Sequence, residues 1–141
     1  MADDSATETV RRSYEAMISG DVATLMAQFA QDCAWHEAGG RDVPHSGVHQ
    51  GPIEIMTMLG NLSVLTEGTG KFDLEDLFSD GAGHVVAVHR ATARRPDGRT
   101  IDAREAMVFY VEDGLIRSVR NCYDDLSKGI AFWSESPNRE E

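Results

Sequence analysis

The stretch that decides the fold is residues 71–123, KFDLEDLFSDGAGHVVAVHRATARRPDGRTIDAREAMVFYVEDGLIRSVRNCY. Apolar, β-branched and aromatic residues recur along it with the period of strands, in four runs at 71–78, 85–93, 101–111 and 115–123. An Asp-Gly step separates each run from the next, and connections this short make successive strands antiparallel. The stretch therefore predicts a four-stranded antiparallel meander.

Helical periodicity replaces the strand pattern on both sides of this meander. The segments with that period are 5–20, 22–29, 52–62 and 126–133. Asp21 is placed to cap the second segment, and Asp124 or Asp125 to cap the last. Cys33 to Trp35 predicts a short strand, and the Gly-rich residues 38–51 predict a loop. Helices followed by a meander indicate an α+β domain in which helices cover one face of an antiparallel sheet.

Both faces of the meander are apolar, since Val86 and Val88 alternate with Val85 and Ala87. One face packs on the helices. The other face has no cover within the chain, and an uncovered apolar sheet face is typical of an interface between two copies. We therefore expect a homodimer through the outer sheet face.

Composition limits the classes of protein to which the chain can belong. With 141 residues, 41% of them hydrophobic, the chain is long enough for one domain, over residues 1–141, and too short for two. A net charge of −11 disfavours nucleic acid and anionic membrane surfaces as partners. No apolar run reaches the roughly 18 residues of a membrane span, and the acidic start Met1–Asp4 lacks the features of a signal peptide. We expect a cytoplasmic protein.

The cysteines and histidines match no metal or redox motif. Cys33 and Cys122 are far apart, so we expect two partly buried, reduced thiols. His45 and His49 have the spacing of a helical metal pair, but in a Gly-rich loop that spacing fixes no common face. The sequence predicts no metal and no cofactor.

Glu37 is the first candidate catalytic residue. Strand alternation places it on the same face as Trp35, whose ring is large enough to desolvate the carboxylate and raise its pKa. A raised pKa suits a general base. The alternative is that Glu37 ends an edge strand and lies in water.

Glu105 is the second candidate, because it interrupts an apolar strand face. The residues that share this face are Ile101, Ala103, Met107 and Phe109. If residues 96–98 form a three-residue loop, His89 lies opposite Glu105; a two-residue loop sets Arg90 there instead, as a structural ion pair. The first register gives a pair for proton transfer or a buried histidine satisfied by a carboxylate. Asp124, where the last strand meets the final helix, is a further candidate acid or simply a helix cap.

The order of these motifs resembles a known group of proteins. They are a helical hairpin ending Phe29-Ala-Gln-Asp32, a Trp35-His36-Glu37 strand, a Pro44-His-Ser46-Gly47 loop and a meander with Val111-Glu-Asp-Gly114. The chain is similar to the SnoaL-like and ketosteroid-isomerase-like branch of the nuclear transport factor 2-like superfamily over about residues 8–133, with 134–141 as a polar tail. The resemblance implies a cone-shaped α+β barrel, in which a curved antiparallel sheet wraps around the N-terminal helices and a deep apolar pocket.

The resemblance also implies roles for single residues. Glu37 matches the proton-shuttling carboxylate of ketosteroid isomerase. The tyrosine and protonated aspartate that stabilise the enolate in that enzyme are replaced by Ser13 and Met107, with Tyr14 adjacent. Steroid isomerisation itself is therefore not expected unless Ser13 or an imidazole such as His89 supplies a donor. Asp124 lies near a carboxylate that SnoaL-like cyclases place at the end of their last strand.

We thus expect acid–base chemistry on a small apolar organic ligand, with Glu37 as base, His89 or Glu105 as the partner acid and Asp124 in reserve. The expected substrate-binding residues are Ser13, Tyr14, Met17, Trp35, Met107, Phe109 and Trp133. Isomerisation or ring closure beside a carbonyl is the expected reaction class. A non-catalytic module that binds a hydrophobic ligand in the same pocket is the alternative.

Overall fold

The computed structural model describes residues 5–135 of the chain. The acidic start at 1–4 and residues 136–141 of the expected tail lie outside the described residues. In chain order the elements are α1 (Ser5–Ser19), α2 (Val22–Ala27), β1 (Phe29–Glu37), β2 (Gly47–Gln50), α3 (Gly51–Leu65), β3 (Lys71–Ser79), β4 (His84–Arg94), β5 (Thr100–Glu112), β6 (Leu115–Tyr123) and α4 (Leu126–Trp133).

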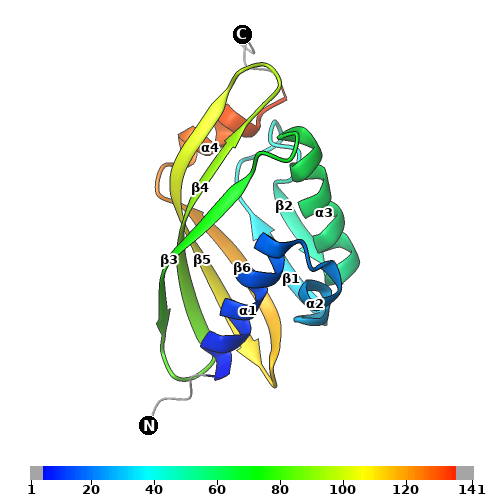
Figure 1. Ribbon diagram of the computed structural model, residues 1–141, viewed down its shortest axis with the longest axis vertical. Coiled ribbons are helices and arrows are strands. Elements are labelled where there is room, and N and C mark those ends of the chain that lie inside the picture. Colours follow the sequence, from blue (N-terminus) through cyan, green and yellow to red (C-terminus); the bar gives the residue numbers. More distant parts are fainter. Residues whose placement is uncertain (1–4, 136–141) are drawn as a thin grey trace.

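The strands form one curved, unclosed sheet in the order β2-β1-β6-β5-β4-β3. Figure 1 shows α1, α2 and α3 on one side of this sheet and α4 at the end where the β4–β5 hairpin lies. The α+β cone is therefore confirmed, and the four strands of the meander pair antiparallel as predicted.

The sheet is mixed, which corrects the expectation of a wholly antiparallel one. β1 pairs in parallel with β6, with Trp35 opposite Val119. A tight turn cannot join parallel neighbours, and here β2, α3 and the first three strands of the meander intervene between β1 and β6. Their pairing therefore leaves no local signal in the sequence.

Two boundaries near β1 also differ from the sequence prediction. Phe29 was assigned to the second helix, but α2 ends at Ala27 and Phe29 begins β1, where it is buried. Gly47–Gln50 was assigned to a loop but pairs with β1 as β2, with Trp35 opposite His49. This strand is short and mostly exposed, so hydrogen bonding to β1, and not an apolar pattern, defines it.

The core lies between the concave face of the sheet and the helices. Its fully buried side chains come from both layers: Val10, Ile55, Val85, Ile116, Val119 and Cys33. Both thiols are free, as expected, but Cys33 is fully buried and Cys122 is exposed, so neither is partly buried as predicted. Among the described helices, none is long and apolar enough to cross a membrane.

Candidate functional site

A cavity of about 460 Å³ lies inside the cone, between α1, α3 and the concave face of the sheet. Every substrate-binding residue expected from the sequence lines it: Ser13, Tyr14, Met17, Trp35, Met107, Phe109 and Trp133. Glu37, His89 and Glu105 line it too. Its volume lies within the range of about 300–1,000 Å³ typical of small-molecule sites.

Glu37 is buried at the end of β1, with only 8% of its surface exposed. Its carboxylate accepts a hydrogen bond from Trp35 Nε1 at 2.7 Å and weaker ones from Asn121 Nδ2 at 3.2 and 3.4 Å. Burial raises the pKa of Glu37 to about 7, helped by the charge of Glu105 and opposed by these donors. The alternative of a solvated carboxylate on an edge strand is wrong, because β1 lies between β2 and β6.

His45 lies beside Glu37, with its Nε2 3.8 Å from Glu37 Oε1. Burial lowers the pKa of His45 to about 4, so the ring is neutral at pH 7 and the two residues do not form an ion pair there. The ring packs edge-on against Trp133 of α4. Within residues 5–135, no cationic side chain therefore offsets the effect of burial on Glu37, which raises the pKa of this carboxyl group.

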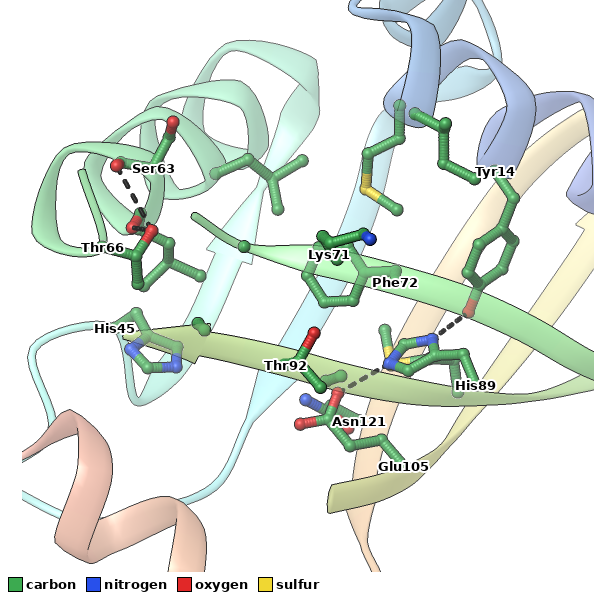
Figure 2. A pocket seen from close by; sticks show the side chains of 18 of the residues that line it. Tyr14, His45, Ser63, Thr66, Lys71, Phe72, His89, Thr92, Glu105 and Asn121 are labelled. Atoms are coloured by element: carbon green, nitrogen blue, oxygen red, sulfur yellow. Dashed lines mark hydrogen bonds and ion pairs between the residues drawn. The ribbon is translucent and has the colours of Figure 1, made fainter. Parts of the chain in front are cut away.

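A second polar cluster joins α1, β4 and β5 across the cavity (Figure 2). The Tyr14 hydroxyl lies 2.6 Å from His89 Nδ1, and His89 Nε2 lies 2.7 Å from Glu105 Oε1. All three residues are buried, and burial together with the charge of Glu105 raises the pKa of Tyr14. Tyr14 therefore stays a neutral hydroxyl at physiological pH.

The register of the β4–β5 hairpin produces this cluster, and the three-residue loop is confirmed. Arg95 pairs with Arg99, Gly98 takes a φ of 97°, and His89 lies opposite Glu105. The alternative Arg90–Glu105 pairing is wrong.

The same register sets Arg90 opposite Arg104 on the outer face. Each of these like charges has an acidic partner there. Arg90 pairs with Asp102, and Arg104 pairs with Glu75 of β3. Both guanidinium groups are exposed, so water also screens their mutual repulsion. The two arginines are thus held by ion pairs on the outer face, and the His89–Glu105 pair lies on the inner face.

Asp124 does not join the site. It is exposed after β6 and lies outside the cavity lining. The cap of α4 is its neighbour Asp125, whose carboxylate accepts hydrogen bonds from the backbone of Ser127 and Lys128. Asp124 is therefore too far from the cavity lining to act as its acid.

Sequence reasoning missed several polar residues that line the cavity, among them His45 beside Glu37. Two others, Asn121 and Tyr123, lie on β6. Strand alternation puts them on the same face as Val119, so the pattern marked them as inward-facing. Only the parallel pairing of β1 with β6 brings Asn121 to Glu37, and that pairing had no sequence signal.

No group of three or more metal-ligating side chains comes together within residues 5–135. The histidine pair with metal-like spacing makes a local contact instead, since His49 Nε2 lies 2.7 Å from the backbone carbonyl of His45 and donates to it. The site is thus built from carboxyl, imidazole, phenol, indole and amide groups on apolar walls, which are groups that can bind and transfer protons.

These features define a class of protein, the α+β cone with an apolar pocket that holds buried ionisable side chains. Residues 10–119 match the SnoaL-like domain family, and the chain belongs to this family, in the SnoaL-like branch of the nuclear transport factor 2-like superfamily. Over 134 residues it is 34% identical to an uncharacterized protein of Mycobacterium tuberculosis (strain ATCC 25618 / H37Rv), covering 95% of this chain and 100% of that one.

Two solved structures have the same fold. Bal32a, from a soil-derived mobile gene cassette, is 34% identical and superposes with a TM-score of 0.87 over 92% of this chain and 97% of its own. TerC, co-crystallized with polyporic acid, has a TM-score of 0.77 over 87% and 94% of the two chains. At 16% identity, TerC supports the fold alone.

Proposed function

We propose that the protein is an acid–base enzyme that moves a proton on a small, largely apolar organic molecule held in the cone. The reaction class is proton abstraction beside a carbonyl, followed by isomerisation or ring closure, with Glu37 as the base. The chemistry needs no cofactor, because every step is a proton transfer between ligand and side chain.

One observation carries this proposal, the raised pKa of Glu37 at the wall of an apolar cavity. A general base works best when its pKa lies near the operating pH, and burial brings that of Glu37 to about 7. Trp35 and Asn121 hold the carboxylate in one position without a positive charge that would weaken it as a base. A purely structural carboxylate in an apolar wall would gain stability from a cationic partner, and here the neighbouring imidazole is neutral.

Structural neighbours support the kind of ligand. TerC was co-crystallized with polyporic acid, an organic molecule, and belongs to the same fold. The walls of the present cavity are largely aromatic and aliphatic, from residues such as Phe29, Phe72, Leu62 and Phe109. We therefore expect a ring ketone or a molecule of similar polarity as substrate.

The experiment is α-proton exchange. A set of cyclic ketones with one to three rings, with 1-tetralone as the reference, is incubated in D₂O with the protein, and loss of the α-proton signal is followed by NMR. Glu37→Gln should slow exchange by about 10²- to 10⁴-fold, the usual contribution of a general base. The matched control is Glu75→Gln, which removes a carboxylate on the outer face and should leave exchange unchanged.

Binding of the same ketones separates the enzyme from the binding module. Glu37→Gln keeps the shape of the cavity, so ligand affinity should survive in either case. If the wild type binds ketones tightly but exchanges none of them faster than buffer, the pocket is a binding site and Glu37 is not a base.

A homodimer through the outer sheet face belongs to the same proposal. Phe78 of β3 is 58% exposed, and it lies opposite Val86, which in turn lies opposite Val108, along that face. An exposed aromatic next to a row of valines favours burial against a second copy. Light scattering of the wild type should give twice the chain mass, and Phe78→Asp should give monomers.

A further inference from the structure

The end of the cavity around Glu37 collects hydrogen-bond acceptors. Asn121 uses its Nδ2 hydrogens on the Glu37 carboxylate, and its amide oxygen Oδ1 has no partner within residues 5–135. His45 turns Nε2 toward Glu37, which favours the neutral ring with its proton on Nε2 and leaves Nδ1 as a bare acceptor, also without a partner there. A carboxylate, an amide oxygen and an imidazole nitrogen therefore lie together, and all three offer lone pairs.

Aromatic rings surround these acceptors. The Trp35 indole donates to Glu37, the Trp133 ring packs against His45, and all of these residues line the cavity. Tyr123 lines it as well, and its pKa is raised by burial and then by the charge of Glu37. The faces of aromatic rings carry partial negative charge and attract cations, indole most strongly. The walls at this end therefore add to the negative potential of the carboxylate.

Positive charge that could balance Glu37 is scarce. Among the described residues that line the cavity, Lys71 is the one lysine or arginine. It is exposed at the start of β3, and its charge is not among the influences on the pKa of Glu37, whereas that of Glu105 is. The whole chain carries a net charge of −11, so its field favours the approach of cations and disfavours that of anions.

We propose that the Glu37 end of the cavity binds the ammonium group of a protonated apolar amine, whose hydrocarbon part packs on the apolar walls. An ammonium group donates to the carboxylate in a charge-assisted hydrogen bond and places its positive charge against the ring faces of Trp35 and Trp133. A hydroxyl group donates one hydrogen bond but leaves the carboxylate uncompensated. A carbonyl oxygen only accepts, so it finds no complement among the acceptors at this end.

This ligand class goes beyond the proposed function, and its binding does not depend on catalysis. A bound ammonium group holds the same carboxylate that the proposed function uses as a base. An amine of this kind therefore blocks proton abstraction and competes with a ketone for the cavity. Apolar amines are thus expected as inhibitors of ketone exchange, which ties the occupancy of the site to a second class of small molecule.

Binding of an ammonium group is linked to the proton on Glu37. The cation favours the ionised carboxylate, and the pKa of Glu37 in the free protein is about 7, so binding at pH 6 releases close to one proton. Affinity should rise about tenfold from pH 6 to pH 8, as the ionised fraction rises. The groups that face Glu37 are His45, with a pKa of about 4, Tyr123, whose pKa is raised, and Glu105, which is paired with His89. Replacement of Glu37 separates its titration from theirs.

The test compares 2-aminotetralin with 2-tetralol, which share one carbon skeleton and differ in an ammonium or a hydroxyl group. Titration calorimetry in buffers of different ionisation enthalpy gives both the affinity and the number of protons released. At pH 8 the amine should bind roughly tenfold more tightly than the alcohol, the value of a hydrogen bond to a charged group. Only the amine should release a proton at pH 6. Glu37→Gln should remove the release, the pH dependence and the preference for the amine, and the outer-face control Glu75→Gln should change none of them.

Equal affinities for the two probes overturn the proposal, and so does a proton release or pH dependence that persists in Glu37→Gln. Failure of the amine to bind overturns it as well. None of these readouts is turnover, so the absence of ketone exchange would refute Glu37 as a base and leave amine binding standing. Where exchange is observed, 2-aminotetralin should inhibit it at concentrations near its own Kd, and exchange that continues at saturating amine would refute a shared site at Glu37.

Discussion

Two buried carboxylates face the same cavity, and their surroundings differ in kind. Glu37 accepts hydrogen bonds from neutral donors, an indole and an amide, while Glu105 holds an imidazole at 2.7 Å. Both are less than a tenth exposed. Glu37 thus has no partner that can take up a positive charge at neutral pH, and its pKa rises to about 7.

The comparison shows that two glutamates in one pocket can have hydrogen-bond partners of different kinds. Burial alone favours the protonated form of a carboxyl group and raises its pKa. A nearby group that can carry a positive charge favours the ionised form and lowers the pKa. Glu37, which lacks such a partner, is therefore the carboxyl that we propose as the base near pH 7. Glu105 instead holds the His89 ring in a hydrogen-bonded cluster with Tyr14.

The largest expected effect is the pH dependence of the unfolding free energy that comes from protonation of Glu37. Its pKa is higher in the folded protein than the ordinary 4.5, so this stabilisation is complete below pH 4.5 and is lost as the pH rises through about 7. At 1.36 kcal/mol per pKa unit, the loss amounts to about 3 kcal/mol. Glu37→Gln has no charge to lose, so its unfolding free energy relative to wild type should rise by that amount between pH 4 and pH 8.

Urea denaturation across this pH range measures the difference directly. His45 works in the opposite direction, because its lowered pKa costs stability as the pH falls from 6.5 toward 4. His45 is present in both proteins, so its contribution cancels. A constant difference between the two proteins would mean that Glu37 is solvated and ionised throughout, and the contrast with Glu105 would vanish.

The next largest effect is expected from Tyr14→Phe. The substitution keeps the ring and removes the hydroxyl, which leaves His89 Nδ1 buried without its partner. An unsatisfied buried polar atom costs about 1–3 kcal/mol of unfolding free energy. Ser13→Ala is the control, because the Ser13 hydroxyl bonds chiefly to the Thr9 carbonyl of its own helix. Equal losses for the two variants would argue against a coupled cluster.

A smaller effect should follow from Trp35→Phe, which removes one of the neutral hydrogen-bond donors that distinguish Glu37 from Glu105. The indole hydrogen bond lowers the pKa of Glu37, so its loss should move that pKa upward by roughly one unit. The rise in the rate of ketone exchange with pH should then occur at a higher pH. Trp133→Phe changes another indole of the same cavity, which packs against His45, whereas the indole that donates to Glu37 is that of Trp35; it should leave the profile in place.

Much of this site was predictable where a local rule applies. Alternation along one strand placed Glu37 beside Trp35, and a three-residue loop placed His89 opposite Glu105. The parts that were missed depend on docking between distant segments. Tyr14 reaches His89 across 75 residues of chain, and Asn121 reaches Glu37 through a parallel strand pair. Such contacts follow from how the layers pack, which local patterns do not encode.

The smallest effect is expected one position away from the cluster of Tyr14, His89 and Glu105. Arg90 follows His89 along β4, but strand alternation turns it to the outer face, where it pairs with Asp102 in water. Exposed ion pairs contribute little, because solvent screens both charges. Arg90→Gln should therefore leave the melting temperature nearly unchanged and the rate of ketone exchange unaltered. If it matched the loss caused by Tyr14→Phe, disturbance of the hairpin would explain both results, and the inner-face cluster would have no separate role.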